Sequence, residues 1–400
     1  MMSRNVPKLR FKGFEDEWKK YELDDIAMIS KSKYNPTKSN KTYKCIELEH
    51  IAQEDGRILG YVNSKEQNSI KNKFDSGDIL FGKLRPYLKK YWISNFEGVC
   101  SSEIWVLKAR KISNSFLYRI VQSEKFNNIA NVSSGSKMPR ADWNYMSSTI
   151  FLVPKLNEQE KIANFLSKVD SIIEKQEKKV EYWNSYKKGM MQKIFSQKIR
   201  FKDKKGRNYP EWEKVHLNKF VERVVRKNKD NVSKRPLTIS AQYGLVDQEE
   251  FFNKLVASKN LEGYYLLKNG EFAYNKSYST GYPFGAIKRL DKYENGAVST
   301  LYICFKVKNN INSDFIVQYF ESSKWHKEIA MIAVEGARNH GLLNVSVSDF
   351  FETIHYIPCL EEQNKISKFL LNIDNILFKE NKKLEELVQW KKGLLQQMFI

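Results

Sequence analysis

The sequence predicts an α+β protein in which two mixed globular blocks are joined by two long helices that pair as an antiparallel coiled coil. Three observations predict this class: a 40-residue segment that occurs twice, heptad spacing of apolar residues in both copies, and short β-like runs in the sequence between them. The expected domains are two globular blocks and two helical spacers related by a pseudo-two-fold repeat. In chain order they are residues 1–154, 155–200, 201–358 and 359–400.

The repeat is the clearest feature of the chain. Residues 157–196 align with residues 361–400 without a gap, and 17 of the 40 positions are identical. A weaker echo links Arg10-Phe11-Lys12 to Arg200-Phe201-Lys202, with a Trp following each tripeptide. The chain is therefore expected to hold two copies of one unit, each a variable block followed by a similar helical segment.

The two similar segments read as long helices because apolar residues recur at alternating steps of four and three positions. We expect each seam to pack against the seam of the other copy, although packing of each helix on its own block remains an alternative. The core of the predicted seam comprises Ile162, Leu166, Val169, Ile173, Ile366, Leu370, Ile373 and Leu377.

The blocks between the helices mix β-like runs with helical patterns, so each is expected to be a compact α+β domain. The β-like runs are Asp78–Phe81, Ile104–Leu107, Leu301–Val307 and Thr353–Ile357. The helical patterns cover Asn114–Ala130 and Asp314–Ala333.

Charge gives the first indication of function. The net charge is +21, and the positive excess is shared by both blocks rather than confined to a tail. Such a field suits a polyanion, and nucleic acid is favoured over a membrane surface because no amphipathic anchor accompanies it. A merely Lys-rich solvated surface remains the alternative explanation.

Composition and the absence of known motifs exclude several classes of protein. There is no run of 18 apolar residues and no signal-peptide pattern, and the four cysteines form no C-x-x-C pair, so we expect a cytoplasmic protein without membrane, zinc or disulfide. No phosphate-binding loop, dinucleotide-binding turn or H-E-x-x-H metal motif is present. The sequence therefore predicts a binding protein with no catalytic residues, no metal site and no cofactor of its own.

Each block carries two loops in which basic, aromatic and amide side chains gather. One loop follows the β-like run near residue 80 or 273, and the other precedes the run that ends in proline. Lysine and arginine neutralise phosphates, arginine can bind guanine and asparagine can bind adenine. A solvated surface loop is the alternative for any one of them. The candidate DNA-binding residues are Lys83, Arg85, Tyr87, Lys137, Arg140, Lys276, Tyr278, Arg338, Asn339 and His340.

At both block ends the sequence reads Pro-x-x-x-Glu-Gln-x-x-Ile-x-x-Phe-Leu-x-x-x-Asp and continues to a Lys-Lys-Gly step. With its two divergent blocks and two similar helices, the whole chain resembles the specificity subunit of type I restriction-modification systems. One departure is an insert, Asp203–Asn208, before the Trp of the second block. The motif residues are Pro154, Glu158, Gln159, Ile162, Phe165, Leu166 and Asp170, and Pro358, Glu362, Gln363, Ile366, Phe369, Leu370 and Asp374.

The resemblance implies that each block is a target recognition domain that reads half of a split site on double-stranded DNA. It implies two methyltransferase subunits and restriction subunits as partners, with S-adenosylmethionine, ATP and magnesium on those partners. The complex would methylate adenine and cleave DNA with ATP, while this chain would catalyse nothing. A bivalent nucleic-acid-binding scaffold with no methyltransferase partner is the alternative function.

Helix length sets an expectation for the DNA site. The seam from Ile162 to Ile194 corresponds to roughly 50 Å of helix at about 1.5 Å per residue. An antiparallel pair of such helices would hold one block at each end. We therefore expect two short recognised elements whose centres lie about one helical turn of DNA apart, separated by an unread spacer of fixed length.

Overall fold

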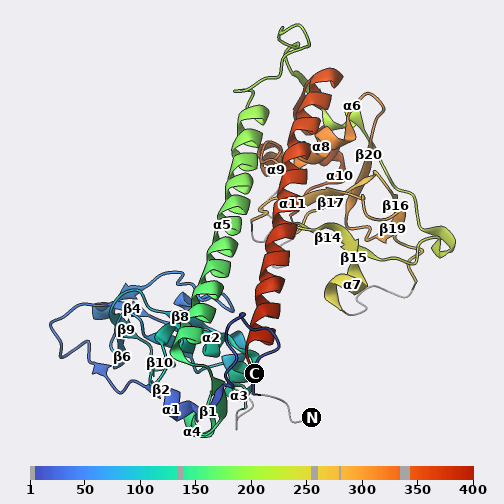
Figure 1. The fold of residues 1–400 in the computed structure, drawn as a ribbon. Coiled ribbons are helices and arrows are strands. Elements are labelled where there is room, and N and C mark those ends of the chain that lie inside the picture. The colour runs from blue at the N-terminus through green and yellow to red at the C-terminus, as the bar shows by residue number, and fades with distance from the viewer. Residues whose placement is uncertain (1–4, 133–137, 254–259, 279–280, 334–342) are drawn as a thin grey trace. The chain divides into compact units, whose positions relative to one another are not determined.

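The computed structural model describes residues 5–132, 138–253, 260–278, 281–333 and 343–400, and it forms two compact units (Figure 1). The first unit comprises residues 1–178 and 381–400, and the second comprises residues 179–380. The two long helices, α5 (Leu156–Phe195) and α11 (Leu360–Met398), each contribute residues to both units.

The centre of the first unit is a four-stranded antiparallel sheet in the order β2-β10-β7-β8. Successive side chains of a strand point to opposite faces, and here both faces are covered. Phe81 and Leu107 pack with α2 and α3 on one face, whereas Leu80 and Val106 belong to a separate core on the other face. Burial on both faces explains the continuous apolar runs in these strands. The elements are β2 (Ala27–Ile29), β7 (Ile79–Gly82), β8 (Tyr91–Ile93), β10 (Ile104–Ala109), α2 (Asn114–Gln122) and α3 (Glu124–Ala130).

Two further sheets complete the first unit. The pair β1-β11 joins the start of the block to the strand that leads into α5. A five-stranded sheet, in the order β3-β6-β9-β4-β5, covers the second core. The strands are β1 (Lys19–Glu22), β3 (Lys33–Tyr34), β4 (Lys44–Ile46), β5 (Val62–Asn63), β6 (Lys71–Phe74), β9 (Gly98–Cys100) and β11 (Ile150–Val153).

The second unit repeats this plan, with a sheet in the order β13-β20-β17-β18 and a pair β12-β21. Its two cores are also separated by strand alternation, since Tyr274 and Phe305 face α8 and α9 while Ala273 and Cys304 face the other core. The units differ beyond this sheet, where the second unit has two small hairpin-like sheets, β14-β15 and β16-β19. The elements are β12 (Glu213–His216), β13 (Val221–Arg223), β14 (Leu237–Ser240), β15 (Gly244–Asp247), β16 (Tyr265–Lys268), β17 (Phe272–Asn275), β18 (Ala286–Arg289), β19 (Asn295–Val298), β20 (Ile303–Val307), β21 (Ile354–Ile357), α8 (Ser313–Phe320) and α9 (His326–Ile332).

Short helices complete both units. They are α1 (Leu23–Ile26), α4 (Trp143–Ser147), α6 (Leu217–Phe220), α7 (Gln248–Phe252) and α10 (Val347–Glu352), together with single 3-10 turns at Leu48–His50, Ser64–Glu66, Pro86–Leu88 and Lys229–Asn231.

Each helical pattern predicted as one stretch is two helices. In the first unit, Ser123 ends α2 and caps α3, because its hydroxyl accepts the backbone N–H of Phe126 at 3.3 Å. In the second unit, residues 321–325 separate α8 from α9. The sequence pattern runs through both breaks because apolar residues continue on either side of them.

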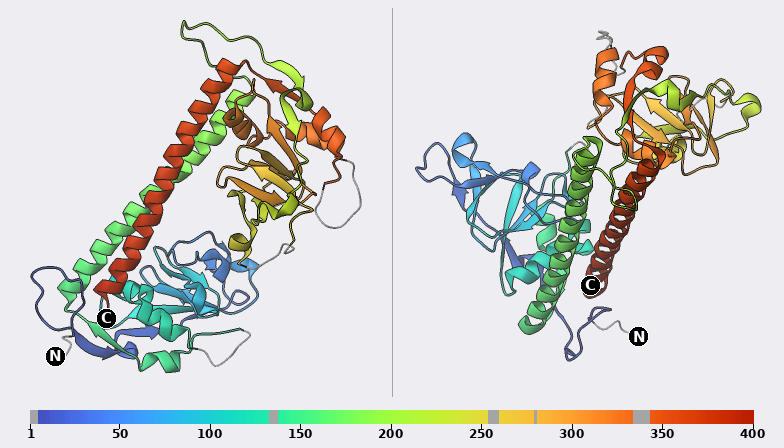
Figure 2. Two further views of the ribbon diagram at one scale, coloured as in Figure 1. Left: turned by 90° about the vertical axis from the view of Figure 1, so that its right-hand side faces the viewer. Right: turned by 90° about the horizontal axis from the view of Figure 1, so that it is seen from above.

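The predicted fold class is confirmed: α5 and α11 run side by side in opposite directions (Figure 2). In the first unit, Ile162 and Leu166 of α5 share a core with Leu394 and Met398 of α11. In the second unit, Ile194 and Phe195 of α5 share a core with Ile366 and Leu370. These two cores also contain residues of the globular blocks, so each seam packs on both the other helix and its own block.

Candidate nucleic-acid interface

The two candidate loops of the first unit lie against each other. Leu84 and Arg140 form an isolated β-bridge, and the backbone N–H of Arg85 donates to the Pro139 carbonyl at 2.8 Å. The N–H of Ala141 donates to the Lys83 carbonyl at 2.9 Å. Loops more than 50 residues apart in the sequence are thereby joined into one surface.

Within this surface the cations differ in availability. Arg140 is held by the Glu103 carboxylate at 3.0 Å, which raises the pKa of Arg140 and occupies its guanidinium. Lys83 and Arg85 have no side-chain hydrogen bond or ion pair within the described part of the chain. Arg85 is exposed and adopts a left-handed backbone (φ 53°), and Tyr87 beside it is 53% exposed. Arg85 and Tyr87 are therefore the side chains most available to a ligand here.

The corresponding loops of the second unit share one of these backbone bonds. The N–H of Leu343 donates to the Lys276 carbonyl at 3.0 Å, as Ala141 does to Lys83 in the first unit. The Lys276 ammonium donates to the Val345 carbonyl at 3.1 Å, and partial burial lowers the pKa of Lys276. Lys276 thus anchors one loop on the other, whereas Tyr278 is 61% exposed. Lys137, Arg338, Asn339 and His340 lie outside the described residues.

The repeated sequence motif builds a clasp between each helix and its block. Glu158 of α5 accepts hydrogen bonds from Arg10 at 2.7 and 2.8 Å and from the Trp18 indole at 3.3 Å. Glu362 of α11 accepts the matching bonds from Arg200 and Trp212. Both carboxylates are buried, and in each case the charge is neutralised by the arginine.

The glutamine that follows extends each clasp. The Gln159 amide donates to the Pro154 carbonyl at 2.9 Å and accepts the backbone N–H of Ser113, just before α2. Gln363 makes the same two bonds, to Pro358 and from Asn312. The sequence shows these positions as a repeated motif but does not show what they contact. The recurrence of Arg-Phe and Trp at the start of both blocks is the sequence feature that could have indicated their partners.

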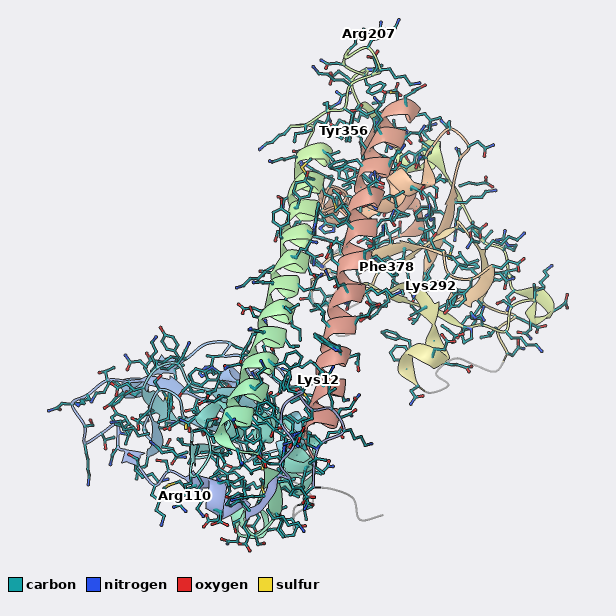
Figure 3. The ribbon with its side chains drawn as sticks, in the orientation of Figure 1. Lys12, Arg110, Arg207, Lys292, Tyr356 and Phe378 are labelled. Atoms are coloured by element: carbon teal, nitrogen blue, oxygen red, sulfur yellow. The ribbon has the colours of Figure 1, made fainter. Side chains whose placement is uncertain are left out.

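The insert before the second tryptophan leaves this clasp intact. Asp203 and Arg207 close a small loop on themselves through the bond from Asp203 N–H to the Arg207 carbonyl at 2.8 Å, next to a Lys202–Asn208 bridge. Figure 3 shows Arg207 at the tip of this loop, away from the helices. Trp212 still donates to Glu362, at 3.1 Å.

The eight predicted seam residues lie on the covered sides of their helices. Seven are at most 8% exposed and Ile173 is partly buried against the first core. The described residues include no group of three His, Cys, Asp or Glu side chains able to hold a metal ion. No helix among the described residues has an apolar stretch long enough to cross a bilayer.

Known proteins similar to this chain include specificity subunits of type I restriction enzymes. Residues 15–182 match the family described as Type I restriction modification DNA specificity domain. The type I restriction enzyme EcoDI specificity subunit of Escherichia coli is 28% identical over 168 residues, which make up 41% of this chain and 37% of that protein. The MjaVIII specificity subunit of Methanocaldococcus jannaschii is 24% identical over 423 aligned positions, covering 95% of this chain and 91% of that protein.

The fold has solved counterparts as well. The S subunit of a type I restriction-modification system from M. genitalium superimposes with a TM-score of 0.55 at 16% identity, over 99% of both chains. The match to the EcoDI subunit spans little more than a third of that protein, whereas the MjaVIII subunit and this solved chain are matched over nearly their whole length. None of these similarities supports a scaffold without a methyltransferase partner.

Proposed function

We propose that this chain is a specificity subunit of a type I restriction-modification system, and that its two units each read one short element of a split DNA site. The observation that carries the proposal is the pair of joined loops at the end of β7 and again at the end of β17. A matching backbone bond, from Ala141 to Lys83 and from Leu343 to Lys276, thus lies beside different side chains in the two units. Equivalent frames with different side chains suit two different half-sites.

The clasps and seams supply the second part of the proposal. Glu158 and Glu362 fix each helix to its own block, and we propose that the paired lengths of α5 and α11 set the distance between the two recognised elements. A fixed helix length then sets the unread spacer between the half-sites. The repeat gives two equivalent helical faces, which suits two modification subunits in the complex.

Catalysis is proposed to come from the partners. The methyltransferase subunits would bring S-adenosylmethionine and methylate adenine, and the restriction subunits would bring ATP and magnesium. This chain, which we place in the cytoplasm, would supply the base contacts and the spacing.

Methylation mapping tests the proposal directly. We expect genomic DNA from the host to carry a methylated split site that disappears when this gene is deleted and returns when it is restored. The tagged chain should also co-purify with a methyltransferase subunit. A single contiguous site, or an unchanged methylation pattern after deletion, would contradict the proposed function.

A further inference from the structure

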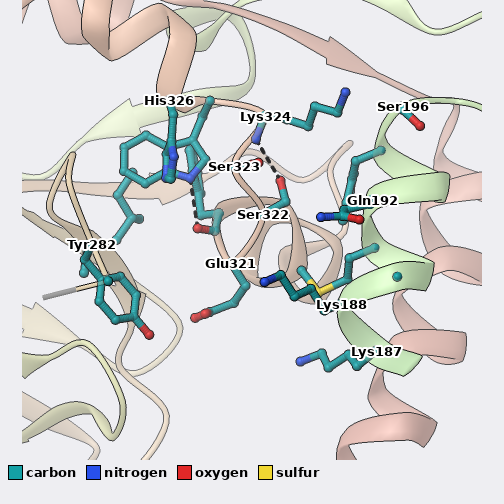
Figure 4. A pocket seen from close by; sticks show the side chains of 18 of the residues that line it. Lys187, Lys188, Gln192, Ser196, Tyr282, Glu321, Ser322, Ser323, Lys324 and His326 are labelled. Carbon is teal, nitrogen blue, oxygen red and sulfur yellow. Dashed lines mark hydrogen bonds between the residues drawn. The ribbon is translucent and has the colours of Figure 1, made fainter. Parts of the chain in front are cut away.

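A cationic groove of about 960 Å³ lies within the second unit (Figure 4). One wall is the last three turns of α5, the second is the loop that joins α8 to α9, and the third is the hairpin between β17 and β18. In Figure 4, Lys188 and Gln192 extend from α5 toward the loop that carries Glu321 and Ser322. All three walls belong to one compact unit.

Lysine side chains give this groove an excess of positive charge. Six lysines line it, whereas Glu321 is the one acidic side chain among its described lining residues. Lys288 neutralises Glu321 at 2.5 Å, and Lys187 is committed to Asp374 at 2.5 Å. The other four, Lys188, Lys193, Lys198 and Lys324, are exposed and have no side-chain partner within the described residues.

The largest apolar side chains of the lining belong mostly to the core of the unit. Met191, Phe195 and Trp325 are at most 8% exposed because they belong to the core of the unit. The specific means of recognition that this groove offers is therefore the positive charge and hydrogen bonding of its exposed polar side chains. Ser196, Ser322 and Gln192 add hydroxyl and amide groups to the four free ammonium groups. Such a set suits an extended anion with many acceptor oxygens.

The third wall connects this groove to the candidate base-reading surface. Lys276 and Tyr278 begin the β17–β18 hairpin, and Gly281, Tyr282 and Gly285 of the same hairpin line the groove. Gly285 fits closely there, since a Cβ at this position would lie 2.1 Å from the Asn275 carbonyl oxygen. The reading loop and one wall of the groove thus belong to the same short hairpin.

We propose that this groove binds the phosphodiester backbone of the DNA whose bases the adjoining hairpin reads. The proposal rests on the proposed function and adds the contact that positions the second unit on its half-site without reading sequence. Lys188 and Lys324, on facing walls, supply the principal ammonium groups.

The test compares two double variants of the full chain on a duplex that carries the mapped site and on one with the second half-site scrambled. Lys188→Gln with Lys324→Gln removes two groove cations, and Lys234→Gln with Lys292→Gln removes two exposed cations outside the groove. Each lost phosphate contact lowers the slope of log affinity against log salt by about 0.9. We expect the groove variant to lose about 2 units of slope, with the same fold-loss on both duplexes, and the control to change little.

Each other outcome has a definite meaning, provided that thermal melting shows both variants folded. An unchanged slope, or an equal loss in the control, would overturn the groove as a phosphate site. A loss confined to the mapped site would mean that the lysines read bases, which also overturns it. Loss of a co-purifying modification subunit at unchanged slope would make the groove a protein contact instead. If the unmodified chain prefers neither duplex, the proposed function itself fails.

Discussion

The ammonium group of Lys391 lies 2.7 Å from the carboxylate of Asp170 and joins α11 to α5 in the first unit. The matching pair in the second unit is Lys187 with Asp374, at 2.5 Å. The aspartates end the repeated motif, and the lysines begin the Lys-Lys-Gly step. The third partner differs, because Asp170 also accepts from Arg119, whose side chain is 3% exposed, whereas Asp374 accepts from the neutral Gln318. The aspartate of the first unit therefore binds a buried cation, Arg119 of α2, and the aspartate of the second unit does not.

This difference predicts unequal costs for the same substitution. Asp170→Asn leaves Arg119 and Lys391 without a counter-charge, so we expect the free energy of unfolding to fall by about 2 kcal/mol, less than for a fully buried pair because Asp170 is partly exposed. Asp374→Asn leaves only Lys187 without a counter-charge, so the loss in free energy of unfolding should be about half as large. Urea denaturation of the two variants measures both values. Equal costs would show that Arg119 finds another partner.

The clasp at Glu362 predicts a larger effect with an internal control. Glu362 is fully buried, and Glu362→Gln would leave the Arg200 guanidinium without its buried anion, costing about 3 kcal/mol. Arg200 also contacts Glu211 at 3.3 Å, but that side chain is 89% exposed. Glu211→Gln should therefore change stability by less than about 0.5 kcal/mol. If the two variants melt alike, the clasp does not stabilise the second unit.

A buried histidine gives the second unit a defined response to acid. Burial lowers the pKa of His355 to about 3, with the Tyr319 hydroxyl 2.9 Å from Nδ1 and the Thr353 hydroxyl 2.9 Å from Nε2. The unfolded chain takes up this proton near pH 6.5, and the folded chain only near pH 3. The contribution of His355 to stability is thus complete above pH 6.5. It falls by up to about 1.4 kcal/mol per pH unit between those values.

Denaturation curves at several pH values check this response. His355→Gln should flatten the loss of stability below pH 6.5, while lowering stability at neutral pH because the new side chain packs less well. His216 is exposed, so His216→Gln is the matched control for the loss of an imidazole. If His355→Gln loses stability below pH 6.5 as steeply as the unmodified chain, a group other than His355 causes the acid response.

The loops of the first unit predict a change in specificity. Replacing Lys83 and Arg85 by Ala should weaken DNA binding and, if either reads a base, relax one half-site by about 1–3 kcal/mol per contact. Arg110→Ala is the control. Arg110, labelled in Figure 3, is an exposed arginine of the same unit, and its side chain donates a hydrogen bond to the Asp24 carbonyl. Competition binding with duplexes altered in one half-site measures the effect. Unchanged affinity and site would show that these loops do not touch DNA.

The sequence predicts the helices and the sheet strands well, since heptads and apolar runs are local signals. Ile104–Leu107 lies within β10, and both long helices occur. Contacts between residues far apart in the sequence could not be predicted in this way. Glu158 meets Arg10 from 148 residues away, and recurrence marks both residues without stating that they touch. Likewise, the sequence predicts Lys276 as a cation available to DNA, whereas in the structure its ammonium group donates a hydrogen bond to the Val345 carbonyl. Partners of this kind depend on strand order, which composition and periodicity do not encode.

The last prediction concerns helix length as the ruler of the DNA site. The clasps tie the start of α5 to the first block and the start of α11 to the second, so added helix should move the blocks apart. Inserting seven residues after Lys178 and seven after Glu380 preserves the heptad phase of both seams and adds about 10 Å of helix. We expect methylation mapping to show a longer unread spacer with both half-sites unchanged. Seven residues placed between Lys204 and Lys205, in the looped-out insert, are the control and should leave the spacer as it was. A spacer indifferent to the paired insertion would mean that α5 and α11 do not set the distance between the half-sites.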